Sequence, residues 1–153
     1  MKRVFRGLRA AFRAAALLLC CAVAPTGATA QQVMVVGNDR GGYVGVRASE
    51  VMRLKAARTQ VRILGDICYS SCTMYLGAGD VCVSPSTTFG FHGPSRNGVP
   101  LPQSQFEHFS NLMAQHYSPG LRDWFMRSAR YSIHAPYTMR GSELIRLGYR
   151  SCG

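Results

Sequence analysis

The chain has 153 residues, with 18 Lys and Arg against 7 Asp and Glu and a formal net charge of +11. The basic residues are spread along the chain and form no dense stripe with interleaved aromatic residues, so we expect no nucleic-acid partner. The length fits one compact domain after removal of a leader.

Residues 1–30 have the three parts of a secretory signal peptide. Five basic residues come first, an apolar run follows at residues 14–24, and the segment ends in Ala28-Thr29-Ala30. The apolar run is too short for a stable membrane anchor. We expect cleavage before Gln31, leaving residues 31–153 as one periplasmic or secreted domain. Loss of the five basic residues leaves 13 Lys and Arg against 7 acids, a net charge of +6.

Four cysteines remain after this cleavage: Cys68, Cys72, Cys82 and Cys152. In an oxidising compartment an even number favours disulfides, and four cysteines allow three pairings. A spacing of four residues on a helix separates two Cα atoms by about 6 Å, which a disulfide can span. We expect Cys68–Cys72 across one turn and Cys82–Cys152 at the C-terminus. The alternative is a zinc site, but C-x3-C with two distant cysteines is a weak zinc pattern. We expect no metal and no cofactor.

Apolar periodicity and turn residues predict about four strands and five helices in α/β order along the rest of the chain. The strands are expected at residues 33–36, 60–67, 81–83 and 87–91. The helices are expected at residues 43–58, 73–76, 103–117, 120–129 and 142–147, and a mobile Gly/Pro loop at 93–102. A strand-helix-strand unit at the start predicts a right-handed parallel crossover. The expected fold class is therefore a single α/β domain with a mostly parallel sheet.

The stretch at residues 67–94 combines a nucleophile, a base and a backbone suited to an anion. Ser70 lies in a tight Ser/Cys turn between a strand and a small helix, where a serine hydroxyl is held exposed near a helix N-terminus. His92 ends a neighbouring strand, from which it could take the proton of that serine. Two alternatives stay open. Ser70 could cap the helix through its side chain, or Ser71 could be the nucleophile if the register shifts by one residue.

Four segments, in their order and spacing, resemble the Clp protease/crotonase superfamily. They are N-D-R-G-G-Y-V (38–44), C-Y-S-S-C-T-M-Y-L-G-A-G (68–79), V-S-P-S-T-T-F-G-F-H-G-P (83–94) and S-E-L-I-R-L-G (142–148). The chain looks most like exported Clp-like bacterial proteins with a Cys-x-Ser-x-Cys turn and a Gly-Phe-His strand end. The resemblance covers essentially all of residues 31–153 and implies a Clp/crotonase-like ββα spiral.

The same resemblance implies roles for individual residues. Ser70 matches the nucleophile of the family and His92 matches its histidine. The oxyanion hole is implied to come from the amide of Ser71 and from the pair Gly41-Gly42. These are backbone donors, so the chemistry depends on how the glycine turn is held.

The third catalytic residue of the family has no match in this chain. The family has an aspartate just before the final short helix, where residues 134–138 here read H-A-P-Y-T. Loss of the residue that orients the histidine costs about 10⁴ in rate in a well-studied serine protease. The candidates to replace it are His134, a backbone carbonyl, Asp123, Glu107 and Glu143.

The expected function is therefore an exported serine hydrolase, peptidase-like, with a peptide or protein substrate. Relatives of this fold form rings or trimers, which makes a homo-oligomer an expectation of the resemblance. The alternative is a catalytically inactive binding module. A crotonase-type acyl-CoA enzyme comes third, because an exported protein rarely meets CoA and no adenine-binding signature is visible.

Overall fold

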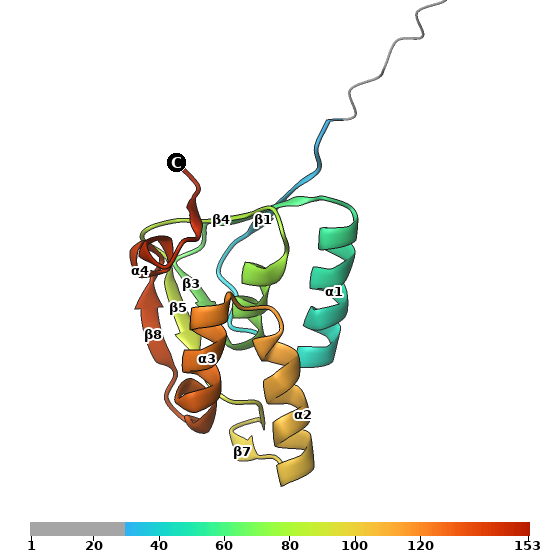
Figure 1. The fold of residues 1–153 in the computed structure, drawn as a ribbon, viewed down its shortest axis with the longest axis vertical. Coiled ribbons are helices and arrows are strands. Elements are labelled where there is room, and N and C mark those ends of the chain that lie inside the picture. The colour runs from blue at the N-terminus through green and yellow to red at the C-terminus, as the bar shows by residue number, and fades with distance from the viewer. Residues whose placement is uncertain (1–29) are drawn as a thin grey trace, which may run out of the picture.

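The computed structural model describes residues 30–153, shown in colour in Figure 1. The expected signal peptide, apart from Ala30, lies outside the described residues. The described chain is mixed α/β. Its elements are β1 (Val33–Val36), α1 (Val44–Ala56), β2 (Gln60–Ile63), β3 (Ile67–Tyr69), the 3₁₀ helix η1 (Ser70–Gly77), β4 (Val81–Val83), β5 (Thr88–Phe91), β6 (Ser95–Arg96), β7 (Val99–Pro100), α2 (Gln103–Ala114), α3 (Pro119–Arg127), the 3₁₀ helix η2 (Ala129–Tyr131), β8 (Tyr137–Arg140), α4 (Gly141–Arg146) and β9 (Arg150–Ser151).

Four parallel strands form the first sheet, in the order β1-β2-β4-β9. The β1-α1-β2 unit is the parallel crossover that the sequence predicts. On one face of the sheet the side chains of Val61, Ile63 and Val83 are fully buried in the core. The mostly parallel α/β class expected from the sequence is therefore confirmed for this sheet.

A second sheet, in the order β3-β5-β8, holds the candidate site. Its β3 and β5 are parallel, and β8 is antiparallel to β5. The expectation of one strand at residues 60–67, and of one core sheet, is wrong. The strand β2 ends at Ile63, and the backbone that follows β1 packs so closely on the next turn that a Cβ at Gly65 would lie 2.2 Å from the carbonyl carbon of Gly37. The side chain of Asn38 then accepts the amide of Asp66 at 2.6 Å and starts the new strand.

Three other segments differ from expectation. The loop expected at residues 93–102 contains the β6–β7 hairpin, turned at Asn97-Gly98 with φ of +52° and +81°. The strands β8 and β9 were not expected, because their side chains are mostly exposed and show no apolar alternation. The small helix expected at residues 73–76 is the longer η1, which begins at Ser70.

The helix η1 lies at the centre of the molecule, between α1 on one flank and β8 on the opposite flank (Figure 1). It contacts α1, α2 and the strands β3, β4 and β5. Every residue at positions 71–76 is buried. Ser70 is partly exposed, so the core encloses η1 and leaves its first residue at the surface.

Both expected disulfides are present. Cys68 and Cys72 have Cα atoms 5.3 Å apart, and Cys82 and Cys152 have Cα atoms 4.9 Å apart. Two disulfides in a small domain are typical of an oxidising compartment. Among residues 30–153, no helix combines the length and hydrophobicity needed to cross a bilayer.

Candidate active site

Ser70 occupies a strained turn between β3 and η1. Its φ is +57°, a conformation that a residue with a Cβ adopts at a cost of about 1–2 kcal/mol. The Cys68–Cys72 disulfide brackets it. Strain of this kind persists only where the surroundings fix the backbone, and it is concentrated at functional sites.

The side chain of Ser70 makes no capping hydrogen bond to η1, the helix that begins at this residue. Tyr69 is the N-cap of η1, and no side chain caps this helix. No hydrogen bond to the Ser70 hydroxyl is found within residues 30–153, so the capping role considered for Ser70 is not seen. The neighbouring Ser71 is fully buried with its hydroxyl unpartnered. Of the two serines, Ser70 is the one that solvent reaches.

A buried hydrogen-bond chain holds the backbone of Ser70 from the core side. The Thr73 hydroxyl donates to the Ser70 carbonyl at 2.7 Å and lies 2.7 Å from the Tyr117 hydroxyl. Burial raises the pKa of Tyr117 well above its usual range, although the hydrogen bond to Thr73 acts in the opposite direction. The phenol therefore stays protonated and can take part in this chain over the whole physiological range of pH.

The glycine turn packs directly against Ser70. A Cβ built on Gly41 would lie 2.5 Å from the Cβ of Ser70, and Gly41 has φ of +99°. The Gly41 amide donates to Asp39 Oδ1 at 2.7 Å, so it is already used. Within the described part of the chain, the amides of Gly42 and Ser71 have no hydrogen-bond acceptor. These two amides are therefore the ones left for an oxyanion.

Asp39 ties this turn to the strand that leads to Ser70. Its amide donates to the Ile67 carbonyl at 3.1 Å, and its carbonyl accepts the Tyr69 amide at 2.9 Å. Its carboxylate accepts Arg47 of α1 at 2.7 Å, and the Arg47 guanidinium stacks on the Tyr75 ring of η1, 4.2 Å from its centre. The glycine turn, α1 and η1 are thus linked through one carboxylate and one guanidinium.

His92 lies at the same edge of the second sheet as Ser70. The parallel register places Tyr69 of β3 opposite Gly90 of β5. Ser70 and His92 therefore follow the carboxyl ends of two adjacent strands. Phe91, fully buried, anchors the end of β5 with edge-on contacts to Tyr117 and Trp124 at 5.7 and 5.5 Å between ring centres. No hydrogen bond joins Ser70 to His92 in the described structure. Such catalytic contacts commonly form only in the substrate complex.

The imidazole of His92 is oriented by a backbone carbonyl. Its Nδ1 lies 2.7 Å from the carbonyl oxygen of Gly93. A carbonyl only accepts, so Nδ1 carries the proton and Nε2 is left as the acceptor. A backbone carbonyl was one of the candidates to replace the missing aspartate, and the Gly93 carbonyl is the group that lies next to His92 Nδ1.

The other candidates for the third residue are engaged elsewhere or exposed. Glu107 forms an ion pair with Arg130 at 2.6 Å, and Glu143 accepts the Arg140 amide at the start of α4. Asp123 and His134 are exposed. All seven acids of the chain lie within residues 30–153, and none is hydrogen bonded to His92.

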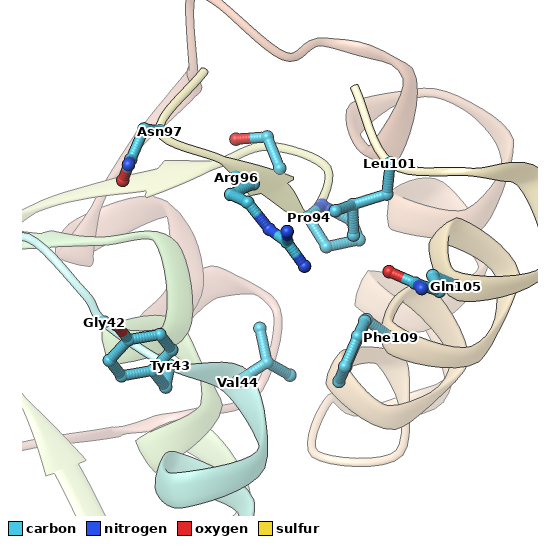
Figure 2. Close-up of a pocket in the computed structure, with 10 residues that line it drawn as sticks. Gly42, Tyr43, Val44, Pro94, Arg96, Asn97, Leu101, Gln105 and Phe109 are labelled. Atoms are coloured by element: carbon cyan, nitrogen blue, oxygen red, sulfur yellow. The ribbon is translucent and has the colours of Figure 1, made fainter. Parts of the chain in front are cut away.

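A cleft of about 740 Å³ opens beside these residues (Figure 2). One wall is formed by Gly42 and the two residues after it, the other by Pro94 and the β6–β7 hairpin. Neither Ser70 nor His92 lines the cleft, but Gly42 follows the glycine that touches Ser70, and Pro94 lies two residues after His92. The lining of the cleft thus begins one residue after the glycine that packs on Ser70 and two residues after His92.

Metal binding by the four paired cysteines has no support in the described structure. Both disulfides consume the thiols, so none of the four offers a thiolate.

No family model matches the chain, and no curated protein matches it either.

Sequence reasoning did not find Asp39, Arg47 and the Gly93 carbonyl. An acid two residues before a Gly-Gly pair is a local signal for a side chain that accepts a glycine amide, as Asp39 does here. Arg47 had a weaker signal, as a partly buried cation on the inner side of a basic helix. No residue type signals the carbonyl of Gly93.

Proposed function

We propose that this protein is a serine hydrolase acting on peptides or proteins, with Ser70 as nucleophile and His92 as general base. The observation that carries the proposal is Ser70 itself: a partly exposed serine at positive φ, with a free hydroxyl, pressed against a glycine turn that leaves the Gly42 amide unbonded. A strained serine between a strand and a helix is the arrangement that exposes a nucleophilic hydroxyl.

In the proposed reaction, each group acts at a defined step. Ser70 Oγ attacks the carbonyl carbon while His92 Nε2 takes the hydroxyl proton. The amides of Gly42 and Ser71 hold the oxyanion, and one such donor is typically worth about 3 kcal/mol. The imidazolium then protonates the leaving amine. Water, deprotonated by His92, attacks the acyl-enzyme carbonyl, and His92 returns that proton to Ser70 Oγ as the acid is released.

The Gly93 carbonyl supplies orientation without a full negative charge. It selects the same tautomer that a carboxylate would select, but it stabilises the imidazolium less. We therefore propose a slow enzyme, with a rate below that of a complete Ser-His-Asp triad.

The Clp/crotonase-like spiral and the extracytoplasmic location are part of this proposal. The four sequence segments, the parallel pairing of β3 with β5, and the position of Ser70 and His92 at one strand edge support the first. Both disulfides and the expected signal peptide support the periplasm or the exterior.

Hydrolysis of quenched fluorescent peptides tests the proposed activity. The oxidised protein should cleave a subset of a peptide library, Ser70→Ala should abolish cleavage, and Ser128→Ala, a change at an exposed serine outside the site, should retain it. Cleavage that persists in Ser70→Ala would contradict the proposal.

A catalytically inactive binding module is the second candidate function. Two observations favour it: Ser70 and His92 are not hydrogen bonded, and no carboxylate supports the histidine. On this account the cleft still binds a ligand, while no peptide is cleaved and Ser70 has no unusual reactivity.

A further inference from the structure

The cleft beside the candidate site carries one formal charge. Its lining residues are Gly42, Tyr43, Val44, Pro94, Ser95, Arg96, Asn97, Leu101, Gln105 and Phe109. Arg96 is the single ionised residue among them, and none is acidic. A peptide group bound here meets a cation and no competing carboxylate.

Within residues 30–153 the guanidinium of Arg96 has no ion-pair or side-chain hydrogen-bond partner. The ion pairs of the described chain involve Arg47, Arg130 and Arg150, and none includes Arg96. Figure 2 shows the side chain of Arg96 directed into the gap between Val44 and Gln105. The Gln105 side-chain amide faces the same gap and provides a neutral polar partner.

The backbone of Arg96 belongs to a paired hairpin. Arg96 pairs with Val99 across the β6–β7 hairpin, whose two-residue turn has both φ angles positive. Turns of this type match the twist of paired strands. Arg96 therefore projects from a strand of this hairpin, four residues after His92.

Part of the remaining lining is apolar, beside the polar side chains of Ser95 and Asn97. Val44 lies on one side, and Leu101 and Phe109 lie on the other. Ligand sites of this kind bury an apolar group of the ligand, and a few polar side chains of the site select the polar group next to it.

We propose that this cleft binds an acidic side chain of a peptide next to a large apolar one, with Arg96 selecting the carboxylate. The inference deepens the proposed function, because it names the substrate class of the same site. The ligand source is a peptide carboxylate, since Gly42, whose amide is proposed to hold a peptide carbonyl, lines the cleft.

The expected effect is modest, because Arg96 is exposed to solvent. An ion pair at an exposed site changes affinity by about two- to fivefold. The preference should also weaken as salt is raised, because counterions screen exposed charges over about 10 Å at 0.1 M.

The test measures binding separately from catalysis. The oxidised Ser70→Ala protein is titrated into two dye-labelled peptides, Ala-Ala-Leu-Glu-Ala-Ala and Ala-Ala-Leu-Gln-Ala-Ala, and fluorescence anisotropy gives Kd. We expect the Glu peptide to bind about two- to fivefold more tightly at low salt. In the Ser70→Ala background, Arg96→Gln should remove the preference and Arg96→Glu should reverse it. Arg146→Gln, a change at an exposed arginine of α4, should keep it.

Three outcomes would overturn the inference: equal affinity for both peptides, a preference that survives Arg96→Gln, or no binding of either peptide at millimolar concentration. The test does not depend on a reactive Ser70. A protein that binds the Glu peptide selectively but never cleaves it would refute the proposed hydrolase and keep the assignment of Arg96.

Discussion

Ser70 has an unfavourable backbone conformation that several neighbours maintain. The disulfide between Cys68 and Cys72 spans it, Thr73 holds its carbonyl, and the buried body of η1 fixes the residues that follow. Removing the Cβ of Ser70 should therefore raise the stability of the fold while it abolishes activity.

Ser70→Gly should be more stable than Ser70→Ala by about 1 kcal/mol, because glycine occupies positive φ without the steric cost of a Cβ. Both variants lack the hydroxyl and should be inactive. Urea unfolding of the three proteins, with the disulfides intact, measures the difference. An alanine variant as stable as the glycine variant would show that the turn is not strained.

Gly41 should not accept a side chain. Alanine at this position combines positive φ with a Cβ 2.5 Å from that of Ser70, so Gly41→Ala should lower the free energy of unfolding by about 2 kcal/mol and slow any reaction of Ser70 at least tenfold. The matched control is Gly45→Ala in α1, where a Cβ meets nothing within 4 Å and should stabilise the helix by up to about 1 kcal/mol. Equal effects of the two substitutions would contradict the packing described for Gly41.

At this scale the places of the motif residues in the fold were predictable and their contacts were not. Residue types and spacing placed Ser70 at a strand-to-helix turn and His92 at a strand end, and they paired the four cysteines correctly. The carbonyl of Gly93 could not be predicted, because its position depends on how the chain turns after β5. Likewise, the use of the Gly41 amide by Asp39 follows from three-dimensional packing, which spacing alone does not determine.

At the scale of elements, the Asp39–Arg47 pair connects the glycine turn with α1 and, through Tyr75, with η1. One oxygen of the carboxylate holds the Gly41 amide and the other holds the guanidinium. We infer that Asp39 is a positioning residue for the Gly42 amide.

Asp39→Ala should lower the rate of Ser70 acylation by about tenfold or more, since a displaced oxyanion donor typically costs 10²–10³ when lost completely. Asp39→Asn keeps an oxygen that can accept a hydrogen bond from the Gly41 amide and should recover most of the rate. It loses only the negative charge that pairs with Arg47. Rates of labelling by a fluorophosphonate, together with urea unfolding, separate positioning from stability. The idea fails if Asn and Ala reduce the rate equally while both proteins remain folded.

Secondary structure was predictable where apolar periodicity is strong. Helices α1, α2, α3 and α4 all lie within two or three residues of expectation. The second strand was extended wrongly because the apolar residues continue past the bend at Gly65 and give no sign of a change of sheet. The strand β8 was missed because its pairing with β5, and not its own side chains, defines it.

At the scale of the whole molecule, the two disulfides have separate tasks. Cys82–Cys152 joins residues 70 positions apart and fixes the C-terminus beside β4, while Cys68–Cys72 closes a loop of four positions around Ser70. In the chain-entropy model, loops of these lengths are worth about 4 and about 2 kcal/mol.

Replacing Cys82 and Cys152 with serine should therefore cost the more stability, while Ser70 reactivity in the remaining folded protein is retained. Replacing Cys68 and Cys72 should cost less stability but lower Ser70 reactivity. Melting temperatures and labelling rates of the two double variants provide the comparison. Equal loss of reactivity in both would mean that the bracketing disulfide has no special effect on Ser70.

The proposed activation of Ser70 by His92 is tested most directly by labelling the oxidised protein with a fluorophosphonate probe, followed by intact mass and peptide mapping. We expect one adduct on Ser70, none in Ser70→Ala, and a rate reduced at least about 100-fold in His92→Ala. A folded wild-type protein that takes up no probe, or an adduct on another residue, would contradict it.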